Sequence, residues 1–186
     1  HPTVDLVSTG MAIVDPLGEL AGVRSGVKDG PLSGDNWPGL YPPPMAHGPT
    51  MIRRTAVAEA KYDNAYTRAE DSDFLSQVLE DHAWAILRDI TYVYAEYTTG
   101  TPANTIAAHH AWLRHLRRHH SRYSLAQFEQ ILITSAKLTA SMVAHALNLS
   151  ERAIQHRSQK PAPNQIAEFE LARAQVMAVL EAKQTK

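Results

Sequence analysis

TASMVAHALNLSERAIQHRSQK, residues 139–160, is the stretch from which the expected fold follows. Its first apolar residues recur every three to four positions, as they do on one face of a short helix. Asn148 tolerates the left-handed backbone that ends a helix, and Ser150 is a good N-cap for a new one. The segment therefore predicts a helix over residues 140–147, a short turn, and a second helix over residues 150–159.

This segment resembles the helix-turn-helix of transcriptional regulators. Ala144 supplies the small residue where the two helices approach most closely. The apolar residues at the motif's core positions are Val143, Leu147, Leu149 and Ile154. The family usually has glycine where this chain has Asn148. The resemblance covers residues 139–160 alone, and it implies a trihelical part with residues 124–136 as the supporting helix. The alternative is a pair of ordinary short helices in an α-helical bundle.

The resemblance also implies a set of nucleic-acid-binding residues, because the second helix of the motif lies in the major groove. The residues expected to face the bases are Ser150, Glu151, Arg152, Gln155, His156 and Gln159. Those expected to hold phosphate are Lys137, Arg157 and Lys160. Those expected to extend the positive surface are Arg114, Arg117, Arg118 and Arg122. The alternative for these four arginines is a solvated helix face.

Charge is divided unevenly along the 186 residues, although the formal net charge is only −1. Residues 1–100 hold 7 lysines and arginines against 14 acidic residues, a net charge of −7. Residues 101–160 hold 8 against 2, a net charge of +6, and they include the helix-turn-helix candidate. A segment of one sign favours a polyanionic partner or a neighbouring subunit of opposite charge.

Composition narrows the class of protein further. With 44% hydrophobic and 20% charged residues the chain can build a core, and without cysteine it has no disulfide framework. No apolar run is long enough for a membrane span. We expect a cytoplasmic protein, with the alternative that a leader has been removed ahead of His1. His115 and His119 have the spacing of two ligands on one helical face, but cysteine and nearby acidic residues are missing, so we expect no metal and no cofactor.

The remaining sequence predicts an all-α protein, a helical bundle behind an extended arm. Residues 1–50 hold 8 of the 9 glycines and 8 of the 11 prolines, which is typical of an extended arm. Such an arm either becomes ordered only against a partner or the helical bundle, or docks on a neighbouring subunit. The helical domain is expected over residues 51–186. Its acidic part, 51–100, is expected to form helices over 51–70 and 73–98. Basic helices are expected over 101–160, and a C-terminal helix over 164–184. Thr101 and Pro102 predict the start of the first basic helix.

Two functions are compatible with these patterns. The first is a homodimeric DNA-binding transcriptional regulator that uses the helix-turn-helix. The alternative is a structural or assembly subunit of a filament, shell, virion or large complex, in which the basic segment pairs with neighbouring subunits or packages nucleic acid. No nucleophile motif, phosphate-binding loop or suggestive carboxylate pair is present, so we expect no enzymatic activity.

Overall fold

The computed structural model describes residues 3–24, 33–66, 68–118, 125–147, 149 and 158–184. Its strands are β1 (Leu6–Val14), β2 (Leu20–Arg24), β3 (Ser33–Asp35), β4 (Met51–Ile52) and β5 (Ala83–Tyr94). Its helices are α1 (Glu70–Leu79), α2 (Glu96–Thr99), α3 (Pro102–Arg118), α4 (Leu125–Ala146) and α6 (Pro163–Gln184), with a 3₁₀ turn at Arg54–Val57. The fold is therefore mixed α/β, and the predicted all-α class is wrong.

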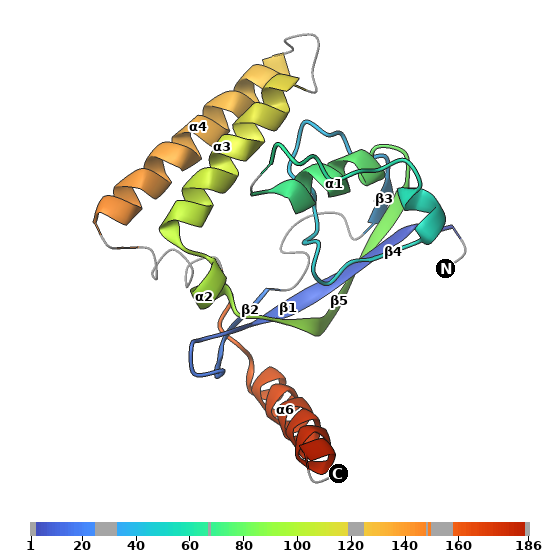
Figure 1. The fold of residues 1–186 in the computed structure, drawn as a ribbon, viewed down its shortest axis with the longest axis vertical. Coiled ribbons are helices and arrows are strands. Elements are labelled where there is room, and N and C mark those ends of the chain that lie inside the picture. The colour runs from blue at the N-terminus through green and yellow to red at the C-terminus, as the bar shows by residue number, and fades with distance from the viewer. Residues whose placement is uncertain are drawn as a thin grey trace.

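A curled mixed sheet is the centre of the fold, with the strand order β2-β1-β5-β3 (Figure 1). β1 and β5 run parallel, with Leu6 opposite Trp84 and Ile13 opposite Tyr94. The other edge of β1 pairs antiparallel with β4 near Leu6 and with β2 from Met11 onward. The segment expected to be an extended arm thus supplies the central strand β1, its neighbour β2, and β3, which pairs with β5.

The predicted long helix over residues 73–98 is divided between α1 and β5. Its second half reads AWAILRDITYVY, and β-branched and aromatic residues of this kind favour a strand. Leu79 ends the helix, and from Ala83 the chain pairs with β1 in extended conformation. The helix expected over residues 51–70 is also wrong, because that region forms β4 and the 3₁₀ turn before an irregular segment.

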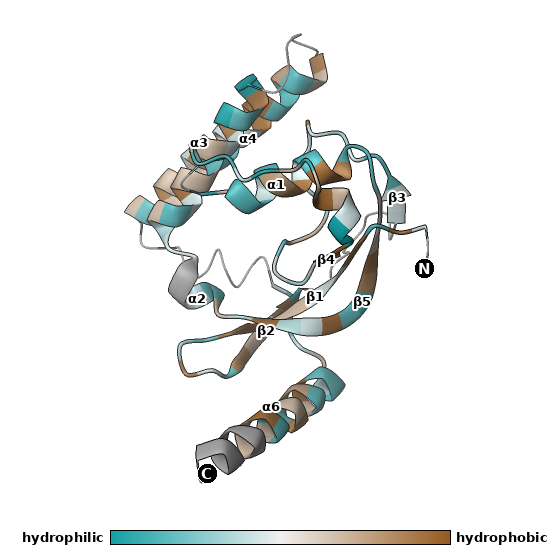
Figure 2. Cartoon of the chain, turned by 45° about the vertical axis from the view of Figure 1, so that its right-hand side comes forward, coloured by the Kyte–Doolittle hydropathy of each residue, from teal (hydrophilic) through white to brown (hydrophobic). Residues whose placement is uncertain are grey.

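The main core lies between α1 and the neighbouring end of the sheet. It contains Leu6, Phe74, Leu75, Val78, Leu79, Trp84 and Ile86, all of them buried. Each such side chain contributes about 1.5–3 kcal/mol when it leaves water. α1 and α6 lie on opposite sides of the sheet in both views (Figures 1 and 2).

The sheet and α1 together form what we call the body. α3 and α4 form a helical hairpin beside it, and α3 lies between α4 and α1 (Figure 1). The start of α3 confirms the prediction, because Thr101 Oγ1 accepts a hydrogen bond from the Asn104 N–H at 3.2 Å. The C-terminal helix is confirmed as α6. The helices expected over residues 124–136 and 140–147 are instead one continuous helix, α4. The separate supporting helix of a trihelical part is therefore absent from the described residues.

Candidate functional site

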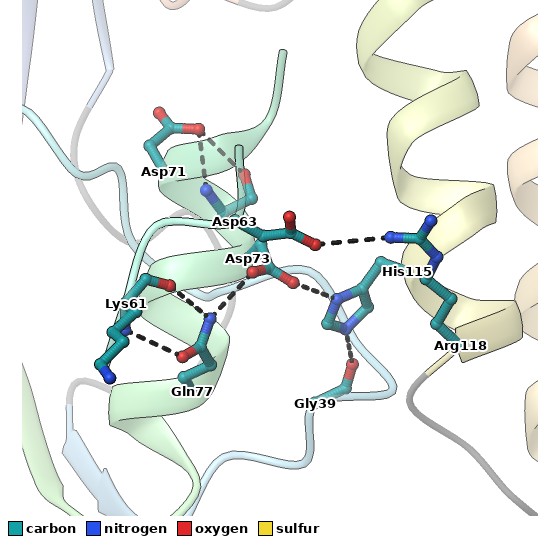
Figure 3. Close-up of polar contacts among 9 residues, drawn as sticks. Gly39, Lys61, Asp63, Asp71, Asp73, Gln77, His115 and Arg118 are labelled. Carbon is teal, nitrogen blue, oxygen red and sulfur yellow. Dashed lines mark hydrogen bonds and ion pairs between the residues drawn. The ribbon is translucent and has the colours of Figure 1, made fainter. Parts of the chain in front are cut away.

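Two features of the hairpin decide what it can do, and the first is a set of polar contacts that fastens α3 to the body. We call these contacts the clamp (Figure 3). At its centre His115 Nδ1 lies 2.8 Å from Asp73 Oδ1 of α1, and His115 Nε2 lies 3.0 Å from the Gly39 carbonyl oxygen. Both side chains are almost fully buried. Both ring nitrogens thus face oxygen atoms, and the contact has the geometry of a buried, hydrogen-bonded Asp–His pair.

Neighbouring groups extend the clamp on both sides. Gln77 Nε2 donates to Asp73 Oδ2 at 2.9 Å and to the Lys61 carbonyl oxygen at 3.0 Å. A buried carboxylate needs such partners, because each unmade hydrogen bond leaves its desolvation uncompensated. With both ring nitrogens directed at acceptors, His115 holds the hairpin in place and presents no nitrogen for proton transfer to a ligand.

The clamp also uses two arginines that were expected to bind nucleic acid. Arg114 donates from Nη1 to the Ala65 carbonyl oxygen at 2.9 Å, and Arg118 lies 3.4 Å from Asp63 Oδ2. The acidic and basic parts of the sequence thus meet within one chain at this junction. A half-exposed pair such as that of Arg118 contributes little to stability, about 0–1 kcal/mol, but it fixes the direction of the side chain toward the body.

The other predicted binding residues do not form one surface. Arg117 on α3 and Lys137 on α4 are exposed. Gln159 and Lys160 are exposed as well, but Gln159 forms a β-bridge with Val23, joined by backbone hydrogen bonds of 2.8 and 3.0 Å. The last residues of the predicted recognition helix are therefore extended chain beside β2, away from the hairpin. Arg122, Ser150, Glu151, Arg152, Gln155, His156 and Arg157 lie outside the described residues.

The second feature is an apolar surface on α4 that we call the apolar stripe. It consists of the exposed side chains of Leu125, Phe128, Leu132, Ile133, Met142 and Val143, whose exposed fractions run from 36% to 90%. Gln127 and Thr134, on the opposite side of α4, are the buried residues of this helix. Gln127 Nε2 donates to the Leu116 carbonyl oxygen of α3 at 2.7 Å. α4 therefore turns a partly polar side to α3 and its apolar side outward.

Sequence reasoning missed both features. The sequence singles out His115 only by its spacing from His119, which lies outside the described residues, and it does not single out Asp73. The apolar stripe was divided between two shorter helices with inward-facing cores. Spacings of three and four along residues 125–143 reveal an apolar face, but they do not reveal whether that face is covered.

Comparisons of the chain with protein-family models, with curated proteins and with solved structures find no match. Within the described residues, no helix combines the length and apolarity needed to cross a membrane. The same residues contain no group of three or more His, Asp or Glu side chains arranged to hold a metal ion. The clamp and the apolar stripe are therefore the features of the molecule that bear on function.

One prediction concerns Tyr66, a buried residue beside the clamp. Burial raises the pKa of Tyr66 above its usual value of about 10, and the charges of Asp73 and Asp63 raise it further while Arg118 lowers it. A raised folded-state pKa means that the folded chain resists ionisation more than the unfolded chain does. The stability due to the neutral phenol is then present below pH 10 and is lost as pH rises through the folded-state pKa.

We therefore expect Tyr66→Phe to lose less stability than the wild type between neutral pH and pH values above about 10. Urea unfolding at both pH values measures the difference. Tyr41→Phe, at a more exposed tyrosine, is the matched control and should follow the wild type. If the Tyr66→Phe variant and the wild type lost the same free energy of unfolding at alkaline pH, a raised pKa of Tyr66 would be contradicted.

Proposed function

We propose that this protein is a peripheral membrane-binding protein, and that the α3–α4 hairpin attaches the α/β body to an anionic lipid surface. The observation that carries the proposal is the apolar stripe, which leaves the outer side of a 22-residue helix uncovered. At 1.5 Å per residue this helix is about 33 Å long. A helix of this kind binds in the plane of the interface, with its apolar side in the boundary between headgroups and acyl chains.

The energetics favour an apolar environment for the stripe. Leu125, Phe128 and Leu132 are each more than half exposed in the isolated chain. Fully removing a side chain of this size from water stabilises the bound state by about 1.5–3 kcal/mol. Exposed Glu129 lies one turn from Leu125, Leu132 and Ile133, so the apolar side chains surround one carboxylate. Exposed apolar patches on soluble proteins commonly mark interaction sites.

Charge favours an anionic surface as the partner. Among the described residues, the exposed cations of the hairpin that are not directed at the body are Arg117 on α3 and Lys137 on α4, and α4 also carries the exposed Glu129. Near an anionic membrane each Lys or Arg contributes about 1 kcal/mol. The anionic leaflet that faces the cytoplasm supplies the required lipid, in accord with the expected cytoplasmic location.

The two functions expected from the sequence are less well supported. Nucleic-acid binding stays a prediction, because Arg114 and Arg118 are directed at the body and most of the expected recognition helix lies outside the described residues. Phosphate contacts also make no use of an apolar surface. Homo-oligomeric assembly stays a prediction too, but part of the charge complementarity that suggested it is already satisfied within one chain.

Vesicle co-sedimentation of two matched variants tests the proposal. Leu132→Glu places a carboxylate on the stripe, and Leu171→Glu makes the same change on α6, where Leu171 is similarly exposed. We expect Leu132→Glu to weaken binding to vesicles containing phosphatidylglycerol by about tenfold or more, and Leu171→Glu to bind like the wild type. Vesicles of phosphatidylcholine alone should bind the wild type more weakly, and salt should weaken binding to the anionic vesicles.

Three outcomes would contradict the proposal. The first is no binding of the wild type to anionic vesicles. The second is equal loss in the two variants. The third is salt-dependent binding to duplex DNA that Leu132→Glu leaves unchanged, together with weak vesicle binding, which would favour the nucleic-acid interpretation. Circular dichroism of both variants confirms that the fold is intact.

A further inference from the structure

A cavity of about 290 Å³ lies between α6 and the sheet, separate from the hairpin. Its sheet side is formed by Ala12 of β1, Val23 of β2 and Val93 of β5, and its helix side by Phe169 and Ala172. Ala12 is buried at its sheet side, whereas Val93, Glu168 and Ala172 are exposed, so the cavity is open to solvent along the helix. The cavity is built from three strands and one helix.

Two connections hold α6 against this part of the sheet. The backbone pairing of Val23 with Gln159 fixes the chain just before the helix. Arg173 Nη1 lies 2.9 Å from Glu19 Oε1, at the turn between β1 and β2. The Arg173–Glu19 pair is half exposed and contributes about 0–1 kcal/mol, so the backbone pairing of Val23 with Gln159 is the stronger of the two connections.

We propose that this cavity binds a small apolar molecule that carries a hydroxyl or amino group. A volume of 290 Å³ is about twice that of an engineered apolar cavity that holds benzene, so the occupant has about twelve non-hydrogen atoms. Binding sites of this type combine an apolar lining with a few polar groups that fix the orientation.

The polar groups of the lining determine which end group fits. They are supplied by Gln165, Glu168, Thr91 and Tyr92. Among the described residues that line the cavity, Glu168 alone is charged. Its carboxylate accepts a hydrogen bond from a hydroxyl or ammonium group and repels another carboxylate. The site therefore selects an amine or an alcohol over a fatty-acid-like anion.

Two probes of nearly the same shape and opposite charge test this selectivity. Titration calorimetry should show saturable binding of 1-naphthylmethylamine and binding of 1-naphthoic acid that is weaker by about tenfold or more. Glu168→Gln removes the charge at an exposed position and should reduce this difference to about threefold or less. Saturable amine binding that Glu168→Gln leaves unchanged would overturn the assigned orientation.

A filling variant tests the location. Ala172 and Ala174 are both exposed, but Ala172 lines the cavity and Ala174 does not. Ala172→Phe should therefore abolish binding of the amine, whereas Ala174→Phe should leave it unchanged. The proposal fails if neither probe binds the wild type saturably, or if Ala172→Phe binds the amine as well as Ala174→Phe does. Vesicle binding is unaffected in either case, so this result is independent of the hairpin.

Discussion

His115→Ala is expected to lower the free energy of unfolding by about 3–5 kcal/mol. The variant leaves the carboxylate of Asp73, which is 1% exposed, without the imidazole that lies 2.8 Å away. It also removes the donor that reaches the Gly39 carbonyl oxygen. Removing one member of a buried polar pair costs more than the pair itself contributes, because the remaining group stays out of water without its partner.

Urea unfolding of His115→Ala and His110→Ala provides the measurement and its control. His110 lies on the same helix but is exposed, so its replacement should change stability by no more than about 0.5 kcal/mol. A double-mutant cycle with Asp73→Asn should give a coupling energy of about 1 kcal/mol or more between Asp73 and His115. Equal effects of the two histidine variants would show that the clamp does not hold the hairpin to the body.

Some features of the fold could be predicted from the sequence, but the clamp could not. The start of α3 was predictable because Thr101 and Pro102 are neighbours and their capping effect is local. The C-terminal helix was also predictable, and α6 begins at Pro163, one residue before the expected start. The pairing of Asp73 with His115 joins residues 42 positions apart, and nothing in the spacing of either residue indicates the other.

The sheet was missed for a related reason. β1 pairs with β5 across more than 70 residues, and parallel pairing of this kind leaves no turn signal between the strands. Apolar residues at spacings of three and four in 83–94 fitted a helix as well as a buried strand. Arg114 and Arg118 were correctly recognised as exposed positive residues of a helix, but the acceptors that they meet depend on the position of α1.

Trp84→Ala is the second variant with a large expected effect, a loss of about 3–5 kcal/mol in the free energy of unfolding. Trp84 is 2% exposed in the core of β5, and its ring meets Trp37 edge-on at a centroid distance of 5.8 Å. Gly34 lies against the same ring, because a Cβ added there would come within 2.9 Å of Trp84 Cζ2. Truncation therefore opens a cavity where three segments meet.

The matched substitution Leu87→Ala distinguishes the strand from the helix that the sequence predicted. In a helix over residues 73–98, Leu87 would lie on the buried apolar face of that helix, with Trp84 beside this face. In β5 Trp84 is buried and Leu87 is 47% exposed, so Leu87→Ala should cost less than about 1 kcal/mol. Trp84→Phe should cost less than Trp84→Ala, because Trp84 Nε1 has no hydrogen-bond partner among the described residues. A larger loss for Leu87→Ala than for Trp84→Ala, measured by urea unfolding, would favour the helix and remove β5 from the sheet.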